Sequence, residues 1–179
     1  MNGRERAGRV RMLLMDVDGT LTDGSLFILP DGEEVKSFHV WDGMGILFAH
    51  QAGIRTGIIS GKTSRSVERR AEKLRVSEVY QGIQDKKKVL GEIASRHKLS
   101  PEEIAYIGDD LGDLEIMKAV GLAGAPADAH PAIRNSSHWV SRYGGGRGAV
   151  REFVEFILEA QGKWDRIEEK VKKLFDDKP

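Results

Sequence analysis

The amino-acid sequence predicts an α/β fold, a doubly wound parallel sheet with helices on both of its faces. Short apolar runs with strand character alternate along the chain with segments of helical periodicity. Strands that are apolar throughout are typical of parallel sheets, because helices bury both faces of such a sheet. A chain of 179 residues can bury one sizeable core but is short for two domains and a linker. We therefore expect residues 1–179 to form a single domain.

Six apolar runs are expected to form the strands of this sheet. The strongest are residues 10–15, 56–59 and 105–107, and weaker runs follow at 76–80, 122–125 and 139–140. The segments between them carry helix signals. Ser100-Pro101-Glu102-Glu103 is a capping box with proline at the first helical position, and Gly53 and Gly121 stand where helices should end.

One segment directly after the first strand breaks this alternation. An apolar run at 25–29 is followed by a Pro30-Asp31-Gly32 turn and by a second, alternating run at 34–40. Two extended runs joined by such turn residues predict a β-hairpin. The hairpin, residues 24–40, is expected to be a flap, since it is too small to be a domain.

The last part of the chain predicts two helices. The first starts at Arg147, and the second lies in a tail formed by residues 162–179. The second helix places its apolar residues on one stripe, Trp164, Ile167, Val171 and Leu174. That stripe needs a packing partner, and the acidic residues beside its lysines favour a protein over a membrane surface.

The overall composition excludes several classes of function. Lys and Arg total 28, as do Asp and Glu, so the net charge of zero gives no general attraction to nucleic acid or to an anionic membrane. The chain has no cysteine, so a metal site must use oxygen or histidine ligands, and a reducing cytoplasm is the expected location. No apolar run approaches the roughly 20 residues of a membrane-spanning helix.

Two aspartates directly follow the first predicted strand, in the segment Asp16-Val17-Asp18-Gly19-Thr20. Alternation along an extended chain points Asp16 and Asp18 the same way. In an open α/β sheet, ligands bind beyond the carboxyl ends of the strands. One carboxylate can attack phosphorus and form an aspartyl-phosphate, while a neighbouring carboxyl group protonates the leaving oxygen. Asp16 and Asp18 can supply these two roles.

A second acidic cluster, Gly108-Asp109-Asp110-Leu111-Gly112-Asp113, follows the predicted strand at 105–107. Mg²⁺ prefers hard oxygen ligands and usually takes one or two protein carboxylates besides a substrate phosphate. Asp16 and Asp109 are the candidates for those carboxylates. Asp113 is expected to support them without binding the metal itself. Taken alone, the cluster is more simply explained as a helix N-cap. Because the first acidic motif is also present, a metal site is the favoured interpretation of this second cluster.

Two polar groups lie between these motifs in the sequence. Ser60-Gly61 follows the strand at 56–59, and Lys86 opens a run of three lysines. A phosphoryl group in transfer needs a hydroxyl or amide donor and a cation. Ser60 and one of these lysines fit that need. Each also has a structural explanation, Ser60 as a strand-end turn residue and the lysines as a solvated helix start.

The order Asp16-x-Asp18-Gly-Thr, Ser60-Gly61, Lys86, Gly108-Asp109-Asp110-x-x-Asp113 resembles the four motifs of haloacid dehalogenase phosphatases. The resemblance implies a Rossmann-like fold with Asp16 as nucleophile and Mg²⁺ ligand. It implies that Asp18 is general acid and base, with its backbone carbonyl on Mg²⁺.

The same resemblance assigns roles to the remaining motifs. Ser60, Gly61 and Lys86 are expected to contact the phosphoryl group or substrate, and Asp109 to bind Mg²⁺. Asp110 and Asp113 are expected to support the metal ligands without binding the metal themselves.

The intervals 19–59 and 61–85 are too short for the cap domains of many haloacid dehalogenase enzymes. Among members without a cap domain, the chain resembles the 3-deoxy-D-manno-octulosonate 8-phosphate phosphatases along nearly its whole length. Besides the catalytic motifs, the shared segments are residues 22–24, 40–45, 127–131 and 145–152. The resemblance implies Mg²⁺-dependent hydrolysis of that phosphorylated sugar acid in lipopolysaccharide precursor synthesis. It also implies a homotetramer in which hairpins and tails help to close neighbouring active sites.

The sugar acid carries a carboxylate as well as a phosphate, so its binding site needs a second cationic group to bind the carboxylate. The resemblance offers Lys62, Arg70 and Lys73, reaching the site of an adjacent subunit; the alternative is that all three are solvated charges. In relatives that act on nine-carbon, sialic-type acid 9-phosphates, the position of Lys62 is often acidic. Lysine here favours the eight-carbon substrate.

Three alternatives remain open from the sequence. The substrate could be a nine-carbon acid 9-phosphate. The chain could be a non-catalytic assembly domain, although its complete set of motifs argues against this. It could be a phosphoryl transferase such as a mutase, which would need a cover that excludes water. The sequence also leaves open whether manganese or cobalt replaces magnesium.

Overall fold

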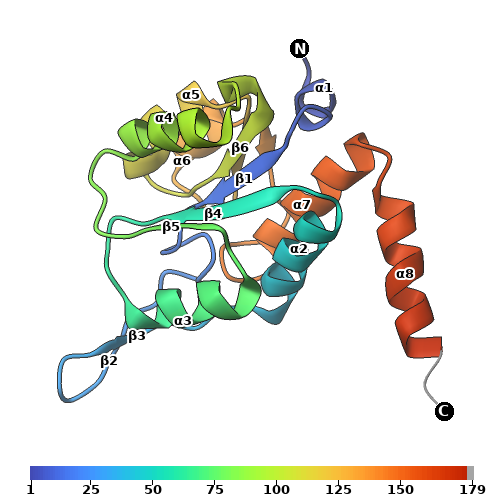
Figure 1. Ribbon diagram of the computed structural model, residues 1–179. Coiled ribbons are helices and arrows are strands. Elements are labelled where there is room, and N and C mark those ends of the chain that lie inside the picture. Colours follow the sequence, from blue (N-terminus) through green and yellow to red (C-terminus); the bar gives the residue numbers. More distant parts are fainter. Residues whose placement is uncertain (177–179) are drawn as a thin grey trace.

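The structure is a computed structural model that describes the backbone of residues 1–176 and the side chains of residues 1–171. A central sheet has helices on both faces (Figure 1). Its six strands are parallel and follow the order β5-β4-β1-β6-β7-β8. They are β1 (Met12–Met15), β4 (Arg55–Ile59), β5 (Glu78–Tyr80), β6 (Ile104–Ile107), β7 (Leu122–Ala125) and β8 (Trp139–Val140). The predicted α/β class and its six strands are confirmed.

The central strand β1 explains why the core has two halves. Successive side chains of a strand point to opposite faces. Leu13 and Met15 pack with the helices of one face, α2 (Val40–Gln51), α3 (Arg65–Leu74) and α7 (Ala149–Ala160). Met12 and Leu14 pack with those of the other face, α4 (Lys86–His97), α5 (Leu114–Ala119) and α6 (Pro131–Ser136). All four side chains are buried, as expected for a strand covered on both sides.

The strand order places a topological switch point between β1 and β6. From β1 the chain adds β4 and β5 on one side of the sheet, then returns to add β6, β7 and β8 on the other. In open α/β sheets, ligands bind in the crevice at such a point, beyond the carboxyl ends of the strands. The residues that follow Met15 and Ile107 therefore lie where a site is expected.

The predicted hairpin is formed by β2 (Phe27–Ile28) and β3 (Glu34–Val35), which pair antiparallel. It projects from one end of the molecule beside α3 (Figure 1). The second extended run is shorter than predicted, because the His39 side chain accepts a hydrogen bond from the Trp41 amide and α2 begins at Val40. The apolar residues of β2 are exposed, Ile28 by 66% of its surface.

Two predicted helix starts differ in the structure. The capping box at Ser100 forms, but it opens only the one-turn 3-10 helix η1 (Pro101–Glu103). Strand β6 begins at the next residue, because Arg11 donates to the Glu103 carbonyl and extends the sheet pairing. The helix predicted from Arg147 begins at Ala149, after Gly148 adopts a φ of +108°.

The chain ends lie outside the sheet. The short helix α1 (Gly3–Ala7) is tied to the body by Arg6, which donates to the Gly121 carbonyl at 2.7 Å. In α8 (Trp164–Asp176), Ile167 is buried and the Trp164 ring lies 5.9 Å from that of Phe48. The predicted apolar stripe thus packs partly on its own chain, while the side chain of Leu174 lies outside the described residues. Among the helices that the structure describes, none has the length and apolar character to cross a bilayer.

Candidate active site

The loop after β1 folds into a tight turn that presents two carboxylates. The amides of Thr20, Leu21 and Thr22 all donate to the Val17 carbonyl, at 2.9–3.2 Å. Gly19 has a φ of +88°, and a Cβ at this position would lie 2.0 Å from Oδ2 of Asp109. Glycine is therefore required at position 19 for two reasons, the positive φ of the turn and the close approach of Asp109. Asp16 is buried at the start of this loop, and Asp18 is partly exposed.

The second acidic loop follows β6, beside β1. The Asp113 carboxylate is buried and accepts hydrogen bonds from the amides of Asp109 and Asp110, at 3.0 and 3.3 Å. Asp109 accepts a hydrogen bond from the Thr20 hydroxyl at 3.0 Å, which links the two loops. Asp110 is exposed at the N-terminus of the one-turn helix η2 (Leu111–Asp113). Asp113 therefore shapes the loop, and Asp109 faces the residues after β1.

Lys86 joins the two acidic loops. It is the first residue of α4, and its buried Nζ donates to Asp16 at 2.5 Å and to Asp113 at 2.6 Å. The Tyr106 hydroxyl lies 3.2 Å from the same Nζ and donates to Asp113 at 2.6 Å. Burial works to lower the pKa of Lys86, but the charges of Asp16 and Asp113 outweigh it and the pKa is raised. Lys86 thus remains a cation beside Asp16.

The carboxylates are crowded enough to hold protons when no metal is bound. Burial, together with the Asp113 charge, raises the pKa of Asp16 to about 6. Burial and the Asp16 charge raise the pKa of Asp109 to about 8. One oxygen each of Asp16, Asp109 and Asp113 lies within 4.8 Å of the others. Such a hard, anionic oxygen set fits a divalent cation, which would take the place of the protons.

The residues after β4 complete the edge of the site. Ser60 is buried at the end of this strand, and its hydroxyl accepts a hydrogen bond from the Lys62 amide at 3.2 Å. Gly61 is exposed beside it. Since β4 pairs directly with β1, Ser60 follows the strand next to that of Asp16. Ser60, Asp16 and Asp109 thus follow three neighbouring strands.

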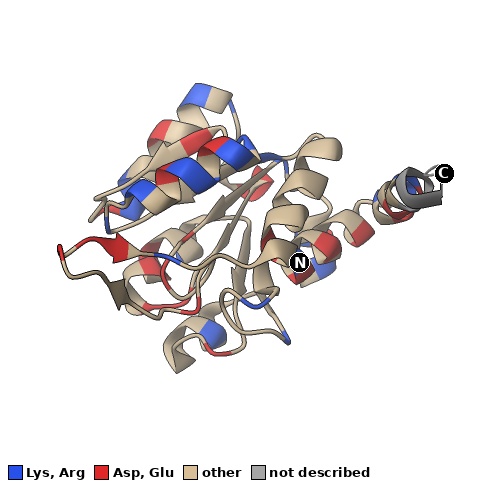
Figure 2. Ribbon diagram, turned by 90° about the horizontal axis from the view of Figure 1, so that it is seen from below, with Lys and Arg blue, Asp and Glu red and all other residues tan. Residues whose placement is uncertain are grey.

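The three cationic residues that were predicted to bind the substrate differ in their positions and contacts. Lys62 is exposed in the loop that precedes α3, in a pocket of about 510 Å³ that also borders Glu33 and Glu34 of the acidic hairpin, red in Figure 2. Arg70 turns toward α2, where it donates to the His39 carbonyl at 3.3 Å and lies 5.9 Å from the Phe38 ring. Lys73 is exposed on α3. Within the residues that the structure describes, no contact joins any of these side chains to Asp16 or Asp109.

The glycine run before α7 supports the catalytic loop. A Cβ on Gly145 would lie 1.8 Å from the Gly19 carbonyl oxygen, and the Gly146 amide donates to the Thr20 carbonyl at 2.9 Å. Asp42 of α2 caps the following helix by accepting from the Gly148 and Arg151 amides. The run is therefore a close-packed turn against the loop after β1.

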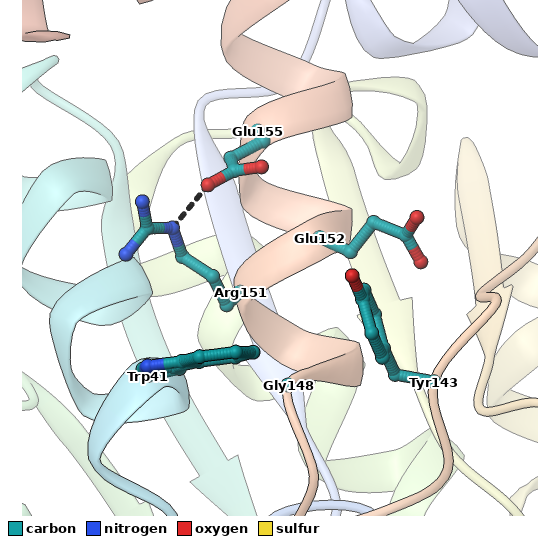
Figure 3. Close-up of a pocket in the computed structure, with 6 residues that line it drawn as sticks. All are labelled: Trp41, Tyr143, Gly148, Arg151, Glu152 and Glu155. Atoms are coloured by element: carbon teal, nitrogen blue, oxygen red, sulfur yellow. Dashed lines mark hydrogen bonds and ion pairs between the residues drawn. The ribbon is translucent and has the colours of Figure 1, made fainter.

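A second pocket lies outside this arrangement. Trp41 and Tyr143 flank Gly148 at the start of α7, and Arg151, Glu152 and Glu155 extend along the helix above them (Figure 3). The cavity is about 240 Å³, and its Arg151 is paired with Glu155. The histidines near the site serve as helix N-caps, His39 for α2 and His130 for α6.

Lys36 and Tyr106 were not predicted from the sequence, and Thr20 was predicted only as part of the first acidic motif, without a role. Lys36 follows β3, and its buried ammonium forms an ion pair with the Asp18 carboxylate. Glu34, Lys36 and Phe38 are less exposed than Val35 and Ser37. A lysine on the inward side of this alternation is the signal that could have identified it. Tyr106 gave no such signal, because an aromatic residue within a buried strand is expected to be part of the hydrophobic core.

Comparisons with known proteins show the family to which this chain is similar. A family described as haloacid dehalogenase-like hydrolase matches residues 75–154. The 3-deoxy-D-manno-octulosonate 8-phosphate phosphatase of Escherichia coli K12 is 42% identical over 160 residues, which cover 89% of this chain and 85% of that protein. The crystal structure of the Yersinia pestis phosphatase of that name has a TM-score of 0.89 and 43% identity, covering 91% of this chain and 88% of the other.

A third relative was solved with ligands. The 3-deoxy-D-manno-octulosonate 8-phosphate phosphatase of Moraxella catarrhalis, in complex with a magnesium ion, a phosphate ion and a KDO molecule, has a TM-score of 0.92. It is 36% identical, and the alignment covers 94% of this chain and 97% of that one.

Proposed function

The chain belongs to the haloacid dehalogenase-like hydrolases, in the family of the 3-deoxy-D-manno-octulosonate 8-phosphate phosphatases, and from this we propose that it hydrolyses that sugar acid phosphate to the free acid and phosphate. The observation that carries the proposal is the arrangement of Asp16, Lys86 and Asp109 at the switch point of the sheet. A nucleophilic carboxylate, a cation and a metal-binding carboxylate are what phosphoryl transfer through an aspartyl-phosphate requires.

In the proposed first step, Asp16 attacks the phosphorus. The bond between Asp16 and phosphorus forms as the bond from phosphorus to the sugar oxygen breaks, and Asp18 gives its proton to that oxygen. In the second step, Asp18 takes a proton from water, whose oxygen attacks the phosphorus and releases Asp16. The order of residues is favourable, since Asp18 lies two residues after Asp16 in the same loop and is partly exposed, so that substrate and water can reach it.

Lys86 and Ser60 are proposed to hold the phosphoryl group. Lys86 already neutralises the nucleophile, so its cation lies where negative charge moves during transfer. Mg²⁺, for which Asp16, Asp109 and the Asp18 carbonyl are the proposed ligands, supplies charge neutralisation of the phosphate when bound. Asp113 orients the Asp109 loop and the Lys86 ammonium without being needed as a ligand.

Substrate choice is proposed to depend on the cations near α3. Lys62 stands one residue from the phosphoryl-binding Gly61, in the pocket between hairpin and helix. A lysine here suits the carboxylate of the eight-carbon acid. Arg70 and Lys73 are further candidates, and the contact of Arg70 with His39 means that it must turn or act on a neighbouring subunit.

We propose that residues 1–179 act as one catalytic unit in a homotetramer located in the cytoplasm. The exposed apolar strand β2 supports assembly, because Phe27 and Ile28 are more than half exposed. Such a patch on a hairpin is unfavourable in water and is typical of a protein interface. The tail after Gln161 is the second candidate contact.

The test is phosphate release with Mg²⁺ and then with EDTA. The panel holds 3-deoxy-D-manno-octulosonate 8-phosphate, a sialic-type 9-phosphate and hexose phosphates. Selective, metal-dependent release from the first supports the proposal. Selectivity for the 9-phosphate would instead support the nine-carbon alternative, and no turnover of any would favour a non-catalytic assembly domain.

A further inference from the structure

Lys36 is a buried cation on an exposed flap. Its side chain is 3% exposed, although Val35 and Ser37 on either side of it are exposed. It is the only lysine or arginine between Ser25 and Val40, and the same hairpin carries Asp31, Glu33 and Glu34. A lysine is rarely buried unless it is paired. The carboxylate that pairs with it within residues 1–171 is therefore informative.

That partner is Asp18. The Lys36 ammonium contacts Oδ1 of Asp18, and among the described residues no other side chain or amide contacts this carboxylate. Asp18 lies in a loop whose other polar groups are fixed, by Val17, Thr22 and Asp109. Among the side chains that the structure describes, Lys36 of the hairpin is the one that fixes the orientation of the Asp18 carboxylate.

We infer that Lys36 is a positioning residue for Asp18, and that through it the hairpin aligns the general acid and base of the reaction. The inference rests on the proposed function. Lys36 donates to Oδ1, which leaves Oδ2 to carry the proton that passes to the sugar oxygen when the bond from Asp16 to phosphorus forms. In the second step the same Oδ2 accepts the proton of the attacking water. A positioned acid or base contributes about 10²–10⁴-fold to such steps.

This role predicts a dependence on the leaving group. A sugar alkoxide needs the proton of Asp18, whereas the 4-nitrophenolate of 4-nitrophenyl phosphate departs without one. Both substrates, however, pass through the same aspartyl-phosphate, whose hydrolysis needs Asp18 as base. A lysine that merely anchors the phosphate, or that holds the fold together, would affect both substrates alike.

The experiment is a rapid-quench measurement of the first turnover with the Mg²⁺-loaded enzyme. The wild type, Lys36→Met, Lys36→Arg and the control Lys88→Met, which changes an exposed lysine of α4, are each mixed with the sugar acid phosphate and with 4-nitrophenyl phosphate. With 4-nitrophenyl phosphate, whose first step stays faster than the second, the burst amplitude counts correctly folded sites, so misfolding of a variant lowers that amplitude without imitating a slower step.

We expect Lys36→Met to slow the sugar-phosphate burst by about 10²-fold. Its nitrophenolate burst should keep its rate, and should be followed by slow turnover. Lys36→Arg should recover part of the loss, and Lys88→Met should match the wild type. Equal slowing of both bursts, an effect on KM alone, or no effect would overturn the inference. If the wild type does not act on the sugar acid phosphate, the proposed function fails separately, and a hexose phosphate takes its place in the comparison.

Discussion

The ammonium of Lys86 lies 2.5 Å from Oδ1 of Asp16, so the proposed nucleophile is paired with its cation before any substrate arrives. The two residues are 70 positions apart in the chain, Asp16 directly after β1 and Lys86 at the start of α4. The same ammonium also contacts Asp113, which is buried. One cation therefore compensates two buried carboxylates.

Removal of Lys86 should cost both stability and activity. Lys86→Met leaves Asp16 and Asp113 without their cation, and an uncompensated buried charge typically costs about 3–5 kcal/mol. We expect the free energy of unfolding in EDTA to fall by about 3 kcal/mol, as measured by urea denaturation, and turnover to be lost. Lys88→Met is the matched control and should change little. An unchanged stability of Lys86→Met would mean that the pairing is absent in solution.

The metal-free protein should become less stable as the pH rises. The pKa of Asp16 is raised to about 6 and that of Asp109 to about 8, both by burial first and by neighbouring carboxylates second. At these two carboxylates the folded state thus binds more protons than the unfolded state between about pH 4 and pH 8, so their contribution to stability falls through this window. Burial lowers the pKa of His50 and of His138, and these two groups act in the opposite direction. Thermal unfolding in EDTA at about pH 5.5 and 8 measures the fall. Asp109→Asn should reduce this dependence of stability on pH. A melting temperature in EDTA that rises with increasing pH would contradict the account.

Lys62 should bias the enzyme toward the eight-carbon acid. Loss of a charge-assisted hydrogen bond costs about 1.5–3 kcal/mol, so Lys62→Glu should lower kcat/KM for that substrate by about tenfold or more. The value for the nine-carbon 9-phosphate should fall less. Arg69→Glu, which reverses an exposed charge on the following helix α3, is the control. Equal losses for both substrates would remove Lys62 from substrate selection.

The hairpin should hold the oligomer together. Ile28→Asp puts a charge on a strand residue that is 66% exposed in the single chain, so the fold should tolerate it and an apolar interface should not. Light scattering should show a tetramer for the wild type and smaller species for the variant. Glu33→Gln at the polar tip should leave the mass unchanged. A monomeric wild type, or a variant that remains a tetramer, would contradict this prediction.

The fold and the positions of the acidic motifs could be predicted because both depend on local pattern. Buried parallel strands are apolar at every position, and the residues that follow them must lie at one edge of the sheet. The local pattern places Asp16, Asp109 and Ser60 at that edge from the sequence alone. It failed at Ser100, where a correct capping box opens only one turn, since pairing of β6 begins too soon for a helix.

Contacts between distant side chains could not be predicted in the same way. The pairing of Lys36 with Asp18 depends on how the hairpin folds back, and the hydroxyl of Tyr106 matters only because α4 starts beside it. The direction of Arg70 is another example, since a long side chain on a helix edge has several possible partners. The sequence gives its position on α3, and only the structure shows it turned toward His39.

The most direct test of the central claim is to trap the phosphoryl group on the enzyme. The Mg²⁺-loaded protein is mixed with 3-deoxy-D-manno-octulosonate 8-phosphate labelled in its phosphate, quenched in acid during turnover, digested and analysed by mass spectrometry. The account predicts a labelled peptide that carries the phosphoryl group on Asp16, and no labelled peptide from Asp16→Asn. Label on another residue, or near-normal turnover by Asp16→Asn, would contradict it.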